Sequence, residues 1–185
     1  VDTMKAMVNT FSDFARAPAI SQEATDLNQL VSGVVDLYRS ANPEARIELD
    51  FEPGVPSLSV DSTRLRQVFN NLIKNALEAS PGKTPELLVR SRRVHGAAGE
   101  QVEVTISDQG DGIPPDMLAN IFEPYVTSKV KGTGLGLAIV KKIVEEHGGR
   151  VSLANNEGPG ATAAVTLPLS SGSKRTPEPR QEALA

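Results

Sequence analysis

Residues 108–137, DQGDGIPPDMLANIFEPYVTSKVKGTGLGL, contain two glycine-bearing turns joined by a polar segment that carries lysines. The second turn, 132–136, runs directly into apolar residues at helical spacing, so its glycines are expected at a helix start. Free N–H groups and the positive dipole end make a helix start an anion site, and glycines let a phosphate approach the backbone. The second turn therefore predicts a phosphate cradle.

Asp108, in the first turn, follows an alternating, strand-like run at 102–106. With glycines two and four residues further on, its carboxylate suits the amino group of an adenine base. Two other phosphate motifs are excluded: the sequence has no Gly-x-x-x-x-Gly-Lys-Ser/Thr pattern, and no strand-like run precedes the turn at 132–136. A short glycine pattern is also compatible with ordinary turns, so the pairing of two turns is what favours a nucleotide site.

The composition excludes several classes of function. The chain of 185 residues is long enough for one domain with a core, and its net charge of −4 argues against nucleic acid as the main ligand. The absence of cysteine excludes disulfides and thiolate chemistry. No apolar run approaches the ~18 residues that span a bilayer, and no signal peptide opens the chain. Because the sequence starts without Met and inside a helical pattern, we expect a soluble fragment of a longer protein.

Apolar spacing predicts three long helices, of which the first two are capped by Asp26 and Asp61; they span 27–41, 61–79 and 137–147. Alternation predicts strands at 46–51, 57–60, 87–94, 102–107, 150–153 and 161–167, and a short helical turn is expected around 116–120. These elements predict an α/β two-layer sandwich in which a mixed sheet packs on the three helices.

The two histidines are expected to be structural. His95 should face solvent in the connection between the strands at 87–94 and 102–107, which form an antiparallel hairpin, and His147 suits the dipole in the last turn of its helix. At the chain ends, residues 1–17 predict an amphipathic helix that either folds onto the domain or meets another chain. From Ser170 onward the polar composition predicts a disordered tail or linker.

A row of polar side chains accompanies the core stripe of the helix at 61–79: Gln67, Asn71, Asn75 and Glu78. Spacings of four, four and three place them along one face. A surface helix can carry two asparagines by chance, but asparagine is a mediocre helix former, and two of them one turn apart suggest a role. Their amide oxygens could ligate a hard cation such as Mg²⁺, which takes few protein ligands and adds phosphate oxygens.

Four motifs follow one another along the chain: NLIKNALEA at 71–79, DQGDGI at 108–113, IFEPYVTSK at 121–129 and KGTGLGLAIVKKIVEEHGG at 131–149. In this order they resemble the N box, first G box, F box and second G box of the catalytic ATP-binding domain of sensor histidine kinases, in the gyrase/Hsp90/histidine kinase/MutL superfamily. GPGATAAVTLPL at 158–169 resembles the closing G-T element, although Ala161 precedes Thr162. The resemblance covers 27–169, and 122–149 is most similar to nitrogen-regulation kinases of the NtrY/NtrB type.

The resemblance implies a Bergerat-type ATP-binding fold and a role for each matching residue. Asn75 would ligate Mg²⁺, Asn71 and Lys129 would be catalytic, and Asp108 would accept a hydrogen bond from adenine. Phe122 and Tyr125 would belong to a mobile lid. The residues expected to bind ATP also include Asn71, Lys74, Asn75, Gly110, Gly112, Ile113, Phe122, Tyr125, Thr127, Ser128, Lys129, Lys131, Gly132, Thr133, Gly134, Leu135, Gly136, Leu137 and Thr162.

The implied function is that of a protein-histidine kinase domain in a two-component system. It would bind Mg·ATP and donate the γ-phosphate to a histidine on a separate dimerisation hairpin, which passes it to a response regulator. Residues 1–20 would end the second helix of that hairpin, 21–169 would form the catalytic domain, and 170–185 the tail. The full-length protein would be a homodimer without a nucleic-acid partner. This domain would be cytoplasmic, linked to a membrane through upstream segments.

Two alternatives stay open: an ATP-hydrolysing conformational clamp of the same superfamily, and a nucleotide-sensing module without transfer activity. The phosphoacceptor motif, a His followed by an acidic residue and Pro, is absent, because His95 and His147 each precede Gly. In the hydrolysing relatives a glutamate one helical turn before the metal-ligating Asn activates water. Asn71 occupies that position here and cannot accept a proton at neutral pH, so we expect slow hydrolysis.

Overall fold

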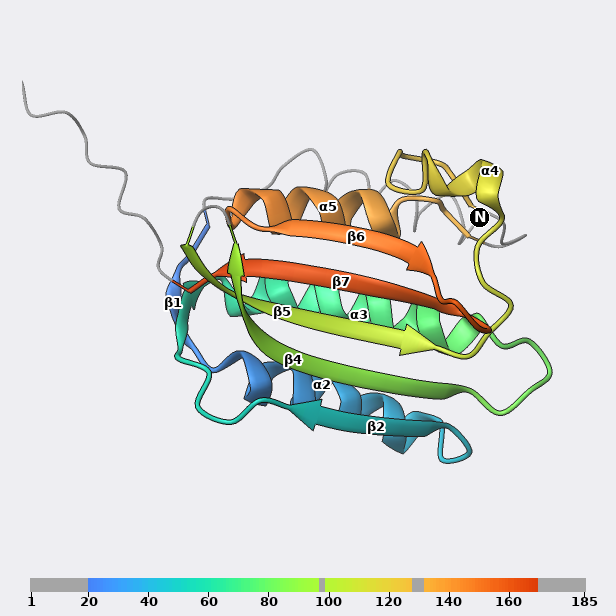
Figure 1. The fold of residues 1–185 in the computed structure, drawn as a ribbon, viewed down its shortest axis with the longest axis horizontal. Coiled ribbons are helices and arrows are strands. Elements are labelled where there is room, and N and C mark those ends of the chain that lie inside the picture. Colours follow the sequence, from blue (N-terminus) through green and yellow to red (C-terminus); the bar gives the residue numbers. More distant parts are fainter. Residues whose placement is uncertain (1–19, 97–98, 128–131, 170–185) are drawn as a thin grey trace, which may run out of the picture.

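The computed structural model describes residues 20–96, 99–127 and 132–169, in which a five-stranded sheet is covered on one face by three helices (Figure 1). The predicted two-layer α/β sandwich with a mixed sheet is therefore confirmed. The predicted helix at 1–17 and the predicted tail from Ser170 lie outside the described residues. Within those residues, no helix has the length and apolar character needed to cross a membrane.

The three long helices are α2 (Leu27–Ala41), α3 (Ser62–Glu78) and α5 (Gly136–Glu146), and α4 (Pro115–Leu118) is a single turn. Both predicted N-caps are present. The side chain of Asp26 accepts from Gln29 N, and that of Asp61 accepts from Arg64 N, each at 3.0 Å. Such caps satisfy backbone donors that the first helical turn leaves without a partner.

The main sheet has the order β2-β4-β5-β7-β6, formed by β2 (Arg46–Phe51), β4 (Glu86–Gly96), β5 (Gly99–Asp108), β7 (Ala161–Pro168) and β6 (Arg150–Asn155). β2 runs parallel to β4, and every other pair is antiparallel. The β4–β5 hairpin is longer than predicted, since its pairing continues through His95 to Gly96 and Gly99. His95 is exposed, as predicted.

A second, two-stranded sheet joins β1 (Glu23–Thr25) to β3 (Leu58–Val60). The sequence predicted β3 but not β1. β1 begins beside Val60, next to the start of α3, and Ser21, just before β1, donates from its N–H to the Asp61 carboxylate at 3.1 Å.

The core lies between the helices and one face of the sheet. Leu65, Phe69 and Ile73 are fully buried on α3, and the alternate residues Val102, Val104 and Ile106 face them from β5. Truncating a buried Phe to Ala typically costs ~3–5 kcal/mol of stability, so Phe69 is a main anchor of this layer. The C-terminal end of α3, the end of β5 and the start of α5 come together at one end of the sandwich, on the right of Figure 1.

Candidate functional site

A cavity of about 800 Å³ opens where the end of β5 meets the end of α3, the start of α5 and the segment around α4. Many predicted site residues line it: Asn71, Lys74, Asn75, Asp108, Gly112, Ile113, Thr127, Gly132, Thr133, Gly134, Gly136 and Leu137. The structure thus brings together residues from all four motifs, which spread from residue 71 to residue 149 of the sequence. A cavity of this size is typical of small-molecule sites.

The α3 wall of the cavity carries the polar row that the sequence predicted. Asn71 and Asn75 stand one helical turn apart, and both line the cavity. Lys74 and Glu78, which also line it, approach each other to 3.9 Å. Gln67, one turn before Asn71, is exposed and is not among the described residues that line the cavity.

Asp108 reaches the cavity because it continues the alternation of β5. Ile106 faces the helices, so Asp108, two residues further, faces the same side and is only 6% exposed. Its Oδ1 accepts from Gly110 N at 2.9 Å and from Ala161 N at 3.3 Å. Within the described part of the chain no hydrogen bond to Oδ2 occurs. Burial raises the pKa of the Asp108 carboxyl above its ordinary value, although the two N–H donors act in the opposite direction.

The two glycines after Asp108 differ in what they do. Gly110 does not line the cavity; a β-carbon there would come within 2.3 Å of Ala79 O, at the end of α3. Asp111 N also donates to that carbonyl at 3.0 Å, so the turn is packed directly onto the C-terminus of α3. Gly112 does line the cavity and has a φ of 75°, a left-handed conformation that glycine adopts without strain.

The opposite wall is the start of α5. Its N-cap, Leu135, has no side-chain cap, so the first-turn N–H groups keep the capacity to bind an anion. Gly136, in the first turn, lies against the Asn71 carboxamide: a β-carbon at position 136 would lie 3.5 Å from Asn71 Oδ1. The predicted phosphate cradle therefore directly faces the asparagine row of α3.

Some predicted site residues lie away from the cavity. Thr162 is on the sheet face opposite the helices, where its hydroxyl contacts Ser107 Oγ and Asn156 Oδ1, each at 2.7 Å. Thr162 does not line the cavity, because strand alternation turns Ala161 and Ala163 toward it instead, and a role for Thr162 in cofactor binding stays a prediction. Within the described residues, Gly110, Phe122, Tyr125 and Leu135 also do not line it, and Ser128, Lys129 and Lys131 lie outside the described residues.

The backbones of Tyr125 and Gly134 are in direct contact. Tyr125 N donates to Gly134 O at 2.9 Å, and a β-carbon on Gly134 would come within 2.5 Å of the Tyr125 backbone. Tyr125 itself has a φ of 69°, which is unfavourable for a bulky residue, and the residue is 63% exposed. The glycine at 134 therefore serves backbone packing as well as lining the cavity.

The sequence did not identify the apolar wall of the cavity. This wall consists of side chains that alternate or repeat with the core pattern: Leu72, Ala76, Ile106, Met117, Ile121, Val126, Leu153, Ala161 and Ala163. Helical and strand periodicity assigns most of these to the core, and does not distinguish a core position from a ligand-facing one. An apolar wall with one buried carboxylate suits a flat, mainly apolar ring that carries a hydrogen-bond donor.

The sequence model of the family "Histidine kinase-, DNA gyrase B-, and HSP90-like ATPase" matches residues 60–171, more than half of the chain. The chain is also similar to the nitrogen regulation protein NtrY of Azorhizobium caulinodans, with 39% identity over 164 residues that cover 87% of this chain and 21% of NtrY.

Two solved structures share the fold. Full-length ShkA in complex with AMPPNP matches with a TM-score of 0.77 at 29% identity, covering 90% of this chain and 36% of that one. Histidine kinase ThkA in complex with the response regulator protein TrrA matches with a TM-score of 0.75 at 26% identity, covering 91% and 48%. This chain thus spans between about a fifth and a half of these three proteins. It belongs to the histidine kinase-, DNA gyrase B- and HSP90-like ATPase family, as the ATP-binding catalytic domain of a sensor histidine kinase.

Proposed function

We propose that this domain binds Mg·ATP with the adenine base at Asp108 and the phosphates between α3 and α5, and donates the γ-phosphate to a histidine on a separate dimerisation hairpin. One observation carries the proposal. A single cavity holds a buried carboxylate with an available oxygen on one side, and an uncapped glycine-rich helix start facing two asparagines on another. These are the two chemistries that a nucleotide needs.

At the base end, the geometry favours adenine over guanine. Asp108 Oδ1 is occupied by Gly110 N and Ala161 N, so Oδ2 is the oxygen that can accept from a ligand. Adenine presents an exocyclic amino group as donor, whereas guanine presents a carbonyl oxygen at the same ring position, which a carboxylate would repel. The apolar side chains of Ile106, Met117 and Ile121 flank this region and suit the faces of a purine.

At the phosphate end, the residues present fit a magnesium ion. The described residues contain no group of three or more His, Cys, Asp or Glu side chains that could hold a metal. Asn75, the ligand that the family resemblance implies, and Asn71 would hold Mg²⁺, because both line the cavity and carry amide oxygens of the hard type that it prefers. When bound, the ion would neutralise charge on the phosphates. The N–H groups at the start of α5 would bind phosphate oxygens, and Thr127 and Thr133 would flank them. Roles for Lys129 and Lys131 stay predictions.

The partners follow from the likeness to longer kinases. We propose that residues 1–20 end the dimerisation hairpin, that 21–169 form the catalytic domain, and that 170–185 form a tail or linker. A response regulator would be the final phosphate acceptor, supported by the ThkA complex with TrrA, and a role in nitrogen regulation is supported by the similarity to NtrY. That the full-length protein is a homodimer, with this domain on the cytoplasmic side of a membrane anchor, stays a prediction.

The positions of the carboxylates that line the cavity disfavour the ATP-hydrolysing alternative, because none in the described part of the chain stands where the water-activating glutamate of the hydrolysing relatives would be. Among the described residues these are Glu78, Asp108 and Asp111. Asp108 is bound to backbone N–H groups beside the proposed base, and Asp111 is paired with Lys83 at 3.4 Å near the end of α3. The position one turn before Asn75 holds the amide of Asn71, which cannot act as a general base.

Transfer of label tests the proposal. The chain is incubated with γ-labelled ATP and Mg²⁺, with and without a separately expressed phosphoacceptor hairpin of a related sensor kinase. We expect acid-labile label on the hairpin, dependent on Mg²⁺, and none on the isolated chain, because neither His95 nor His147 lies in a phosphoacceptor motif. Acid-labile label on the isolated chain, or rapid release of inorganic phosphate without any label on the hairpin, would overturn it.

A further inference from the structure

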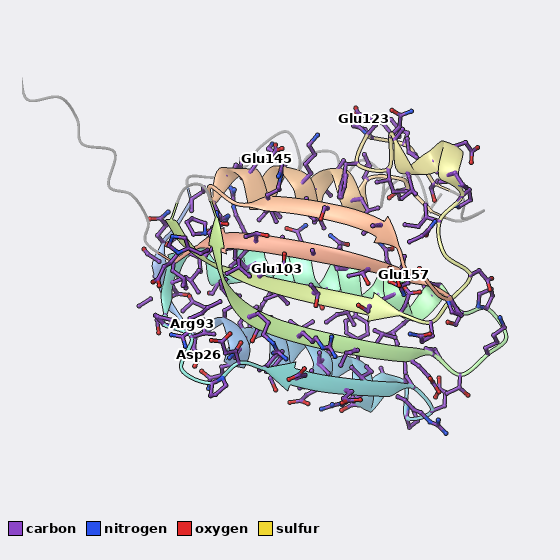
Figure 2. The ribbon with its side chains drawn as sticks, viewed as in Figure 1. Asp26, Arg93, Glu103, Glu123, Glu145 and Glu157 are labelled. Carbon is purple, nitrogen blue, oxygen red and sulfur yellow. The ribbon has the colours of Figure 1, made fainter. Side chains whose placement is uncertain are left out.

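The turn between β6 and β7, residues 155–161, touches the turn that carries Asp108 at several points. In Figure 2, Glu157 marks this turn at the end of the sheet where β5 also ends. Neither Asn155 nor Asn156 is among the described residues that line the cavity. Their side chains nevertheless determine how residues 108–113 sit in it.

Asn155 holds the backbone of Ile113 through both polar groups of its carboxamide. Ile113 N donates to Asn155 Oδ1, and Asn155 Nδ2 donates to Ile113 O, each at 2.8 Å. The two residues are 42 positions apart, so this is a tertiary contact that imitates one rung of a strand ladder. Gly112 is pressed against the same group, since a β-carbon there would lie 3.1 Å from Asn155 Oδ1. Ile113 and Gly112 both line the cavity.

Asn156 and the end of the turn hold Asp108 itself. Asn156 Nδ2 donates to Asp108 O at 3.0 Å and to Pro159 O at 2.8 Å, while Ala161 N donates to Asp108 Oδ1. Gly160 passes so close that a β-carbon would overlap Asp108 O. Two consecutive asparagines therefore fix both ends of the turn, Asp108 at its start and Ile113 at its end.

We propose that Asn155, with Asn156, is a positioning residue for base recognition: it sets the distance between the Asp108 carboxylate and the Gly112–Ile113 rim, and so the preference for adenine. The inference rests on the proposed function, because it takes Asp108 as the acceptor for adenine. Its consequence is a division of labour. The 155–161 turn controls the base end of the cavity, and α3 with α5 controls the phosphate end.

The test separates the two ends by ratios of affinity measured on the 185-residue chain. The ATP-to-GTP ratio reports the base end, and the ATP-to-ADP ratio reports the phosphate end. Asn155→Ala removes two hydrogen bonds and should weaken ATP binding by about tenfold. We expect it to lower the ATP-to-GTP ratio by a similar factor and to leave the ATP-to-ADP ratio within about twofold.

Two further variants make the outcome decisive. Asn155→Asp keeps an acceptor for the Ile113 N–H but sets a second oxygen against the Ile113 carbonyl, so its ATP-to-GTP ratio should also fall below that of wild type; it replaces the alanine variant if that fails to fold. Glu157→Gln, an exposed change in the same turn, is the matched control and should bind like wild type.

The possible failures can be told apart. If wild type does not prefer ATP over GTP, the adenine assignment of Asp108 fails, and this inference fails with it. If wild type is selective but Asn155→Ala lowers ATP and GTP affinity in parallel, or changes neither, then Asn155 is merely structural and only this inference is overturned.

Discussion

Two buried aspartates lie near opposite ends of α3, and they differ in how many of their carboxylate oxygens accept hydrogen bonds. Asp61, at the start of the helix, accepts from Arg64 N with Oδ1 and from Ser21 N with Oδ2, and Arg64 Nε lies 3.8 Å away. Asp108, beside the end of the helix, accepts from Gly110 N and from Ala161 N, both with Oδ1. The two residues are 9% and 6% exposed, so burial alone does not distinguish them.

Their acidities diverge for the same reason. Burial disfavours ionisation of Asp61, but the N–H groups of Arg64 and Ser21 and the Arg64 charge outweigh it and hold the pKa of Asp61 below its ordinary 3.8. At Asp108 burial dominates and raises the pKa above 3.8. A structural carboxylate is thus satisfied on both oxygens, whereas the proposed ligand-binding carboxylate is left half-satisfied, and a perturbed pKa in a cavity is typical of functional sites.

The largest expected effect is on nucleotide binding by Asp108 variants. Asp108→Ala should cost roughly 1 to 3 kcal/mol of ATP binding, because the adenine amino group loses its acceptor. Asp108→Asn can keep Oδ1 as an acceptor for Gly110 N and Ala161 N, and it removes a buried charge. We therefore expect weaker ATP binding by calorimetry but an unchanged or higher melting temperature. Equal ATP affinity in wild type and both variants would end the adenine assignment.

Asp61→Ala should show the reverse pattern. It removes the N-cap of α3 and the anchor of Ser21, and loss of an N-cap typically costs ~0.5–2 kcal/mol. Urea unfolding should report that loss of stability, while the ATP dissociation constant of the folded protein stays within about twofold of wild type. If Asp61→Ala instead lost much ATP affinity without losing stability, Asp61 would serve nucleotide binding, and the contrast between a structural and a ligand-binding aspartate would fail.

A pH titration sharpens the comparison. Because the pKa of Asp61 is lowered on folding, its contribution to stability is present above pH 3.8 and is lost as pH falls through the folded value. Because the pKa of Asp108 is raised, its protonated form contributes stability below pH 3.8 that is lost as pH rises through the folded value. On acidification, ATP affinity should therefore decline at a higher pH than stability does. Asp108→Asn should remove that part of the decline, and an identical profile would contradict its assignment to Asp108.

Local sequence patterns predicted the positions of the two aspartates, but not the histidine that contacts Asp61. Asp61 was identified as an N-cap because capping depends on residues one to three positions away, and alternation in β5 placed Asp108 correctly. His147 was expected only to suit a helix dipole. The structure buries it, with Nε2 accepting from Asp61 N at 3.0 Å and Nδ1 2.7 Å from Ile143 O. The hydrogen bond between Asp61 and His147 joins residues 86 positions apart, and no local pattern predicts it.

The same distinction explains which predicted site residues line the cavity and which do not. Asn71 and Asn75 were found because helical spacing places them on one face. Thr162 was assigned by resemblance to a short motif, and strand alternation turned it to the other face of the sheet. Asn155 and Asn156 lie between the strands predicted at 150–153 and 161–167, and their contacts with Ile113 and Asp108 depend on how two distant turns pack.

The smallest expected effect tests whether a third carboxylate breaks the comparison. Glu78 lines the cavity but is exposed, and its carboxylate lies 3.9 Å from Lys74 on the same helix. It follows Asn75 by three positions, whereas the water-activating glutamate of hydrolysing relatives precedes the metal-ligating Asn. If the carboxylate that contacts the nucleotide is a buried one with an oxygen left without a hydrogen bond from the described residues, as at Asp108, then Glu78 has no such role. Glu78→Gln should then leave the ATP affinity and the slow rate of phosphate release within about twofold of wild type. Exposed substitutions of this kind usually change stability by no more than ~0.5 kcal/mol.

Lys74→Met is the matched variant, since it removes the ion-pair partner and leaves the carboxylate in place. Brisk phosphate release by wild type that Glu78→Gln abolishes and Lys74→Met preserves would make Glu78 a general base, worth ~10²–10⁴-fold in rate, and would favour the hydrolysing clamp over the kinase.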